Sequence, residues 1–283
     1  MKTGISVNFP FTPEAAREKF SHLRLLGYDC ADLQTFVDTE TEWFSAPDPV
    51  RLRKWEETGR IARDCGISLS QTHGPWRHPP RDYTEEDRRE WFDKMCVALE
   101  GTAAVAAPCM AIHNIMPWGT SENPEPERFL EMNRNFFSRL LEKAKACGVV
   151  IALENMPFTN LTLSSPEQVL NFVKEFDSPY FRVCLDTGHA TFFDTTPADA
   201  VRLIGREYLA CLHVHDNDGG HDRHWPPFRG VIDWADFSRA LHEIGYDGTL
   251  SLETDVEKKL PQSVRLEWEK ALASTARALT MAP

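Results

Sequence analysis

The chain lacks the features that mark a membrane protein or a disulfide-stabilised secreted protein. None of its apolar stretches approaches the roughly 18 residues that a membrane-spanning helix needs. The N-terminal segment MKTGISVNFPF has too short an apolar run, and no small-residue cleavage site, for a secretory signal. The seven cysteines are scattered and form no CxxC pair, which favours free thiols in a reducing compartment. We therefore expect a cytoplasmic protein with no membrane partner.

Positive charge is also scarce. The 43 acidic residues outnumber the 31 lysines and arginines, the net charge is −12, and the sequence contains no basic cluster of five or more. Proteins that grip nucleic acid usually concentrate lysine and arginine to neutralise phosphates. The composition therefore lowers the expectation of a nucleic-acid partner.

The chain contains neither linker-like composition nor low-complexity segments. With 283 residues, of which 42% are hydrophobic, it has the length and the apolar content of a single (β/α)8 barrel. Residues 1–283 are thus predicted to form one α/β domain.

Short apolar runs alternate with segments of helical periodicity, and this alternation predicts parallel strands connected by helices. The eight predicted strands are Ile5–Phe9, Cys30–Leu33, Ser68–His73, Cys109–Ile115, Val149–Met156, Phe181–Asp186, Leu209–His215 and Thr249–Thr254.

Several helix ends can be read from local signals. Helices over 50–65 and 125–147 are followed by Gly66 and Gly148, and glycine favours a helix C-terminus. The segment Ser165–Gln168 combines an N-cap serine, a first-turn proline and a capping-box glutamine. Two long aromatic-rich loops, 74–84 and 216–234, follow strands and should lie at the carboxyl-end face.

Six acidic or imidazole side chains stand at the ends of six successive predicted strands. They are His73, His113, Glu154, Asp186, His215 and Glu253. In a barrel, side chains at the carboxyl ends of the strands converge on one point. Carboxylates and imidazoles brought together in this way form a divalent-metal site, so the sequence predicts a metal-dependent barrel enzyme.

Each of these side chains also has a purely structural interpretation. Glu154 in IALENM could pair with a neighbouring arginine, and Asp186 in LDTGH could cap the next helix. His73 and His113 could line the pocket as hydrogen-bonding groups and contact the substrate there. Trp76, with Trp225 and Phe228, could pack the loops or form a wall against the apolar face of a sugar.

The segment HVHDND contains two histidines of the same parity, so His213 and His215 face the same side of an extended strand. His215 is nearer the carboxyl end, which favours it as the metal ligand, with His213 hydrogen-bonded one layer below. Further along, Asp222 and His224 are two residues apart on a loop. They could hold a second metal, contact a polyol, or be solvated.

Glu154 and Glu253 come from the fifth and eighth predicted strands, which we expect on opposite sides of an eight-strand barrel. One carboxylate could remove a proton next to a carbonyl while the other returns it to the opposite face. A metal ion would polarise the carbonyl oxygen and stabilise the enediolate.

These motifs together resemble the xylose-isomerase-like barrels of sugar-phosphate isomerases and epimerases, to which endonuclease IV is related. LEN at Glu154, LDTGHA at Asp186, HVHDND at His213 and LET at Glu253 carry the resemblance over nearly the whole chain. It implies a (β/α)8 TIM barrel that acts on a small-molecule carbohydrate and often pairs as a homo-oligomer.

The ketose 3-epimerases of this family bind one divalent ion. The resemblance implies Glu154, Asp186, His215 and Glu253 as its ligands, with the two glutamates as the acid–base pair. It implies Mn²⁺, with Zn²⁺, Co²⁺ or Mg²⁺ as alternatives, and His189 as a substrate contact. The epimerases carry an arginine six residues after the metal histidine, where this chain has His221.

Two other activities stay open. The same site could abstract a proton beside a ketone and then expel a substituent, as a lyase or dehydratase on a keto-sugar or keto-inositol, including C-glycoside cleavage. The trinuclear zinc site of endonuclease IV also has apparent counterparts here: His73, His113, Glu154, Asp186, His189, His215, Asp222, His224 and Glu253.

Overall fold

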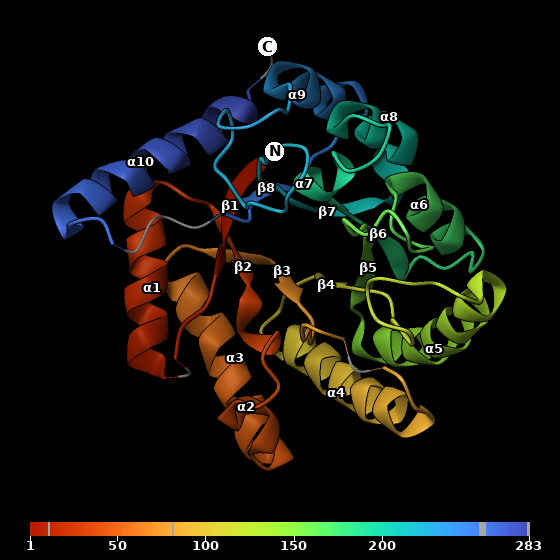
Figure 1. Ribbon diagram of the computed structural model, residues 1–283. Helices are drawn as coiled ribbons and strands as arrows, with labels where there is room; N and C mark the ends of the chain where they lie inside the picture. Colours follow the sequence, from red (N-terminus) through yellow and green to blue (C-terminus); the bar gives the residue numbers. More distant parts are fainter. Residues whose placement is uncertain (11, 81, 255–258, 282–283) are drawn as a thin grey trace.

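Eight parallel strands surround a common axis and carry the helices on their outside (Figure 1). The structure is a computed structural model that describes residues 1–10, 12–80, 82–254 and 259–281. The strands pair in the order β7-β6-β5-β4-β3-β2-β1-β8, and a parallel bridge between Val214 and Leu252 joins the two ends of the sheet. The predicted TIM barrel is confirmed.

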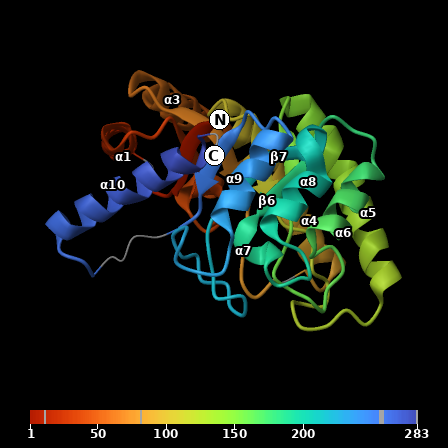
Figure 2. The same cartoon turned by 90° about the horizontal axis from the view of Figure 1, so that it is seen from above.

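The strands are β1 Lys2–Val7, β2 Cys30–Leu33, β3 Ser68–His73, β4 Cys109–Ile112, β5 Val150–Glu154, β6 Phe181–Asp186, β7 Leu209–His213 and β8 Thr249–Leu252. The helices are α1 Pro13–Leu26, α2 Glu42–Ser45, α3 Asp48–Asp64, α4 Glu85–Ala104, α5 Pro126–Cys147, α6 Pro166–Lys174, α7 Thr187–Ala190, α8 Pro197–Tyr208, α9 Trp234–Glu243 and α10 Gln262–Leu279, with a short 3-10 turn, η1, at Gln34–Phe36. Figure 2 shows the same arrangement from above.

The first strand and several strand ends differ from the prediction. β1 begins at Lys2 and ends at Val7, and β4, β5, β7 and β8 end earlier than expected. Parallel pairing stops where the chains diverge into loops, whereas the apolar pattern that predicts strands continues into the buried start of those loops. As a result, His113, His215 and Glu253 lie one or two residues beyond their strands.

The predicted helix caps are present. The Ser165 side chain accepts a hydrogen bond from the backbone of Gln168, whose own side chain returns to the cap and completes the capping box. Gly148 ends α5 in the left-handed conformation with φ 67°. Helix α3 ends at Asp64, one residue earlier than predicted, with Cys65 as its cap and Gly66 next at φ 75°.

The bulky core lies between the strands and the helices, where the largest fully buried side chains include Trp55, Phe137 and Phe172. The interior of the barrel is lined instead by small side chains. Cys109, Ala111, Ala152, Cys184 and Cys211 form a separate buried cluster there. These small residues leave space inside the barrel for polar side chains beneath its mouth.

No helix in the described part of the chain is long and apolar enough to cross a membrane.

Candidate active site and metal centre

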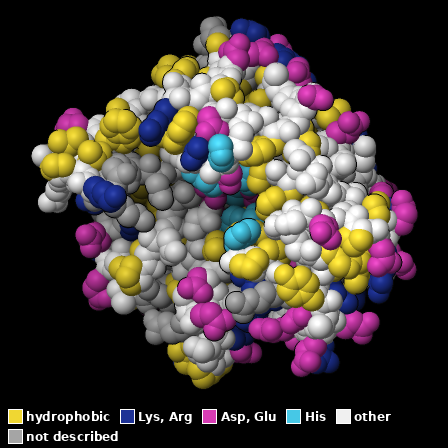
Figure 3. Space-filling model, in the orientation of Figure 1, with side chains coloured by type: hydrophobic (Ala, Val, Ile, Leu, Met, Phe, Trp, Pro, Cys, Tyr) yellow, Lys and Arg dark blue, Asp and Glu magenta, His cyan; other side chains and the backbone are white. Residues whose placement is uncertain are grey.

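A cavity of about 350 Å³ opens at the carboxyl ends of the strands. Figure 3 shows histidine and acidic side chains gathered in the central hollow of this face. The residues that line the cavity are Gln34, Val37, His73, Trp76, His78, His113, Glu154, Met156, Pro157, Phe158, His189, Asp222, His224 and Glu253. Most of the residues predicted from strand ends and loops therefore meet in one place.

Glu154, the last residue of β5, lies at the centre of this cluster and is 1% exposed. Its Oε1 is 3.1 Å from Nδ1 of His213 and 3.6 Å from Nδ1 of His189. Its Oε2 is 3.2 Å from Nε2 of His113 and 3.6 Å from Nε2 of His73. A buried carboxylate needs compensating partners, and four imidazoles supply them here in place of an arginine.

Glu253 follows β8 and approaches the same point from another side. Its Oε1 accepts a hydrogen bond of 3.2 Å from Nε2 of Gln34, and its Oε2 is 3.4 Å from Nδ1 of His213. The side chain is 17% exposed and lines the cavity, so it can reach a bound molecule.

Asp186 is fully buried at the end of β6 and has two roles. Its Oδ1 accepts a bond of 2.7 Å from the backbone N–H of His189 and so caps α7, while its Oδ2 is 3.0 Å from Nε2 of His215. The Asn155 side chain binds both the N–H and the C=O of Asp186, at 2.8 and 3.0 Å. The capping interpretation and the functional interpretation of Asp186 are therefore compatible.

Three groups of side chains each bring their ligand atoms within 4.8 Å of one another. One contains Glu154, Asp186, His213 and Glu253; one contains His73, Glu154 and His213; and one contains His189, His215, Asp222 and His224. Three of the four predicted metal ligands thus lie together, while His215 belongs to the neighbouring group and contacts Asp186 from there. His213, which the sequence favoured as a residue of the layer below, is the imidazole grouped with the three carboxylates.

Three histidines of the site are oriented by backbone carbonyls. Nδ1 of His73, His189 and His224 lies 2.8, 2.8 and 2.9 Å from the carbonyl oxygens of Gly74, Asn155 and Glu253. A nitrogen that faces a carbonyl must carry the hydrogen, so Nε2 of each ring points to the carboxylates. Metal-binding histidines are commonly held in this way.

The two glutamates have pKa values shifted in opposite directions. Burial raises the pKa of Glu253, and the nearby Glu154 carboxylate adds to this shift although His213 opposes it. Burial also disfavours the charge of Glu154, but His213 and His113 outweigh it and hold the pKa of Glu154 well below its usual range. Such a pair, with one carboxylate ionised and the other inclined to hold a proton, suits acid–base chemistry.

The pKa values of the histidines also differ from one another. Burial lowers the pKa of His113 to about 4. For His189, burial is outweighed by Asp186 and Asp222, which raise its pKa to about 9. For His224, burial is outweighed by Asp222 and Glu253, which raise its pKa to about 10.

The donor set fits a divalent cation. Among the described residues, the buried atoms Oε2 of Glu154 and Nδ1 of His213, two residues of the groups of potential metal ligands, have no hydrogen-bond partner. Buried polar atoms are rarely left unpaired, and carboxylate oxygens with imidazole nitrogens are ligands for Zn²⁺, Mn²⁺ or Co²⁺. A cation bound among these atoms would satisfy them.

Trp76 is the predicted aromatic residue that lines the cavity, with its ring 4.3 Å from that of His113. Phe228 is 66% exposed and Trp225 packs under Arg229, so these two rings are surface features of the loop that follows β7. Phe158, which the sequence analysis did not single out, also lines the cavity.

Asp216 anchors the loop that carries Asp222 and His224. Its buried carboxylate accepts hydrogen bonds of 2.9 Å from both the Gly230 N–H and the Trp234 indole. Gln34, Asn155 and Asp216 are thus site residues that the sequence did not reveal. The one signal in the sequence that could have indicated them is their position as polar residues directly after an apolar run.

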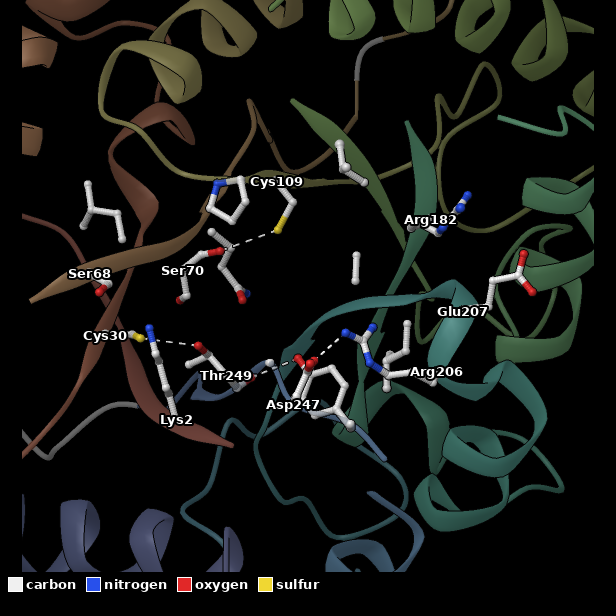
Figure 4. Close-up of a pocket in the computed structure, with 18 of the residues that line it drawn as sticks. Lys2, Cys30, Ser68, Ser70, Cys109, Arg182, Arg206, Glu207, Asp247 and Thr249 are labelled. Atoms are coloured by element: carbon white, nitrogen blue, oxygen red, sulfur yellow. Dashed lines mark hydrogen bonds and ion pairs between the residues drawn. The ribbon is translucent and has the colours of Figure 1, made fainter. Parts of the chain in front are cut away.

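A second, larger cavity, of about 520 Å³, opens at the opposite end of the barrel (Figure 4). It is lined by the first residues of the strands, among them Lys2, Ser68 and Cys109. Arg206 on its rim is paired with Asp247. None of the three groups of potential metal ligands among the described residues lies there, so the carboxyl-end cavity is the candidate active site.

Comparisons with known proteins agree with the predicted fold and family. The D-psicose 3-epimerase of Ruminiclostridium cellulolyticum is 34% identical over 209 residues, which cover 70% of this chain and 67% of the relative. The Methanocaldococcus jannaschii protein MJ1311 is 31% identical over 180 residues, and the match spans 62% of this chain but only 60% of that protein.

A solved structure of D-psicose 3-epimerase with D-tagatose, from Clostridium cellulolyticum, has a TM-score of 0.79 and 19% sequence identity and covers 99% of both chains. This likeness concerns the fold. The epimerase relatives agree with the enzyme class expected from the sequence. A family model described as a xylose isomerase-like TIM barrel matches residues 20–280. The predicted family is thus confirmed: the chain belongs to the xylose isomerase-like TIM barrel family.

Proposed function

We propose that the protein is a divalent-metal-dependent epimerase or isomerase of a ketose or a related polyhydroxy carbonyl compound. The observation that carries this proposal is the pair Glu154 and Glu253, whose carboxylates converge beside one cavity with pKa values shifted in opposite directions. The epimerase relatives support the same class of substrate.

In the proposed reaction Glu154, held in its charged form, takes the proton from the carbon next to the carbonyl. Glu253, whose pKa is raised, delivers a proton to the opposite face of that carbon. A bound divalent ion would polarise the carbonyl oxygen. We propose Glu154, Asp186 and Glu253 as its carboxylate ligands, with an imidazole of the β7 end, predicted to be His215, completing the set.

Other residues of the cavity would bind the hydroxyl groups of the substrate. His189, His113 and His73 line the cavity. Trp76 and Phe158 supply an apolar wall. Asp222 and His224 lie on the loop at its edge.

The position six residues after His215 supports a substrate preference different from that of the ketose epimerases. His221 is exposed, lies 3.2 Å from the Asp218 carboxylate and does not line the cavity. The proposed enzyme would therefore hold the distal part of its substrate without the arginine typical of the family.

The test is to incubate metal-loaded protein with D-psicose, D-fructose and D-tagatose in deuterium oxide. The expected result is an epimeric ketose that has lost no group and carries one deuterium in place of hydrogen at the epimerised carbon. A product that has lost water or an aglycone would identify the lyase alternative. No conversion of any ketose or keto-sugar with Mn²⁺, Co²⁺ or Zn²⁺ would contradict the proposal.

Metal-assisted phosphodiester hydrolysis is a second candidate, because three groups of potential ligands lie side by side. Elemental analysis of the bound metal distinguishes the epimerase from the nuclease. About one ion per chain favours the epimerase, whereas about three zinc ions together with incision of an abasic-site duplex would favour the nuclease.

A further inference from the structure

Asp32 is a carboxylate buried inside the barrel beneath the candidate site. It lies on β2, is fully buried, and its Oδ1 has no hydrogen-bond partner among the residues described. The pairing of β2 with β3 shifts register between Ala31 and Asp32, which sets Asp32 opposite Gln71. Irregularities of this kind redirect a side chain, here into the barrel.

His213 lies directly above Asp32 and below both glutamates. Its Nε2 is 3.3 Å from Oδ2 of Asp32, while its Nδ1 is 3.1 Å from Glu154 and 3.4 Å from Glu253. Since the ring is fully buried, it does not reach a substrate in the cavity. It can affect a substrate only through the two carboxylates that it touches or through an ion bound beside them.

The orientation of His213 is opposite to that of the other oriented histidines of the site. His73, His189 and His224 turn Nδ1 to a backbone carbonyl and Nε2 to the carboxylates. His213 turns Nε2 down to a carboxylate and Nδ1 up to the site. The contact of Nε2 with Asp32 is a close approach of opposite charges and not an aligned hydrogen bond. A carboxylate behind an imidazole favours one orientation of the ring.

Two glutamine side chains hold Asp32 in place. Nε2 of Gln71 donates to Oδ2 of Asp32 at 3.2 Å and to the carbonyl of Leu212 at 3.1 Å, beside His213 in the chain. Nε2 of Gln34 donates both to Asp32, at 3.3 Å, and to Oε1 of Glu253, at 3.2 Å. Asp32, His213, Glu253 and Gln34 therefore form a closed ring of polar contacts.

We propose that Asp32 and His213 are a pair of positioning residues that hold Glu154 and Glu253 at the separation needed for metal binding and proton transfer. The inference rests on the proposed function, because it assigns the two glutamates to that chemistry. Without the imidazole between them, the glutamate side chains would be free to rotate apart. Without Asp32, the imidazole would lose the contact that sets its orientation.

The test is the Mn²⁺ affinity of the wild type and of Asp32→Asn, measured by calorimetry with a competing chelator, together with the absorption spectrum of the Co²⁺ form. Loss of a partner behind a metal ligand typically costs 10–100-fold in affinity, so we expect a decrease of about this size with unchanged stoichiometry. We also expect an altered Co²⁺ spectrum and a fall in kcat larger than the change in KM.

Asp29→Asn is the matched control, because Asp29 precedes the same strand at the other end of the barrel and pairs with Arg277 at 2.9 Å. It should bind Mn²⁺ as the wild type does. His213→Ala should lower the Mn²⁺ affinity. His213→Asn, which keeps a polar atom near the position of Nδ1, should lower it less. Gln34 is half-buried, so Gln34→Leu tests the same ring of polar contacts if the variants at the fully buried positions do not fold.

The inference would be overturned if the affinity and the Co²⁺ spectrum of Asp32→Asn and Gln34→Leu stayed within about twofold of the wild type. If the wild type binds metal but converts no ketose, only the proposed function is contradicted. The ratio of the Mn²⁺ affinities of the wild type and Asp32→Asn still tests the role of Asp32 and His213. If the wild type bound no metal, crystal structures of the wild type and Asp32→Asn would decide, and unmoved Glu154 and Glu253 side chains would overturn the inference.

Discussion

Glu154 and Glu253 meet over a single nitrogen atom: Nδ1 of His213 lies 3.1 Å from the first carboxylate and 3.4 Å from the second. The two glutamates come from β5 and β8, which β6 and β7 separate in the sheet. Closure of the barrel therefore brings within 4.8 Å of each other the ligand atoms of two acids that are 99 residues apart in the chain. The carboxylates differ in environment, one nearly enclosed by imidazoles and the other open to the cavity.

Replacement of either glutamate by glutamine should abolish most of the activity while leaving the fold intact. Glutamine keeps the size of the side chain but neither accepts nor delivers the proton, so kcat should fall by about 10²–10⁴-fold for Glu154→Gln and for Glu253→Gln. Turnover of the best ketose and thermal unfolding are the measurements. Glu207→Gln, an exposed change at the opposite end of the barrel, is the control. Full activity and full metal content in both variants would show that the acid–base assignment is wrong.

Metal removal should destabilise the protein. Glu154, Asp186 and Glu253 place three buried or half-buried carboxylates within 4.8 Å of one another, and a divalent ion would offset their repulsion. A ligand at 100 times its Kd stabilises the native state by about 2.7 kcal/mol, so a chelator should lower the Tm and excess Mn²⁺ should restore it. The same titration on Glu154→Gln should give a smaller shift. An unchanged Tm in the wild type would speak against a bound ion.

Gly188→Ala should disturb His215. A Cβ atom added at Gly188 in α7 would overlap the imidazole ring of His215, which is itself fully buried and cannot move freely. We expect the ring to leave Asp186 and the catalytic activity to fall at least tenfold, a loss of about 1.4 kcal/mol in transition-state stabilisation. Gly220→Ala is the matched control, because its Cβ would meet only Asp218 Oδ1 at an ordinary 3.7 Å. Equal activity of the two variants would contradict a role for His215.

Asp216→Asn should loosen the loop between β7 and α9. Oδ2 accepts from Gly230 and Trp234, and Oδ1 accepts from the N–H groups of Asn217 and Ile232. The amide keeps the shape but has one acceptor oxygen instead of two, at a cost of about 1–3 kcal/mol in the free energy of unfolding. Because this loop carries Asp222 and His224, KM should also rise. Chemical denaturation and steady-state kinetics check both effects, with the exposed Asp194→Asn as control. Stability equal to that of the wild type would show that the loop is held by other contacts.

The stability of the metal-free protein should depend on pH through His189. Although burial opposes the charge, Asp186 and Asp222 raise its pKa to about 9 in the folded state, whereas the unfolded value is about 6.5. The folded protein binds the proton more tightly, so this contribution is complete below pH 6.5 and is lost as the pH rises towards 9. The difference in unfolding free energy between the wild type and His189→Asn should shrink over this window. A difference that did not vary with pH would contradict the assignment.

The part of the site that follows from strand ends was predictable. Parallel strands in a barrel all end at the same face, so Glu154, Asp186 and Glu253 had to converge once the eight strands were recognised. Local signals, such as the capping box at Ser165 and Gln168, depend on a few neighbouring residues and were likewise readable.

The choice between His213 and His215 was not predictable. Both have the same parity, and which of them reaches a given carboxylate depends on the tilt of β7 and on the path of the chain after its last paired residue. In the structure β7 ends at His213, and the backbone of His215 is bound by the Thr187 hydroxyl. Thr187 lies 28 residues earlier in the chain, so no local pattern contains this contact.

The sequence by itself determined the alternation of strands and helices, the helix ends and the placement of acids and histidines at one end of the barrel, because these depend on periodicity and on contacts within a few residues. Only the tertiary structure decided that Asp32, Gln34 and His213 form one network with the two glutamates. Their contacts join strands that are distant in the chain, and a shift in strand register between Ala31 and Asp32 sets the acid opposite Gln71. Such contacts follow from barrel closure and strand register, which no single segment of the sequence encodes.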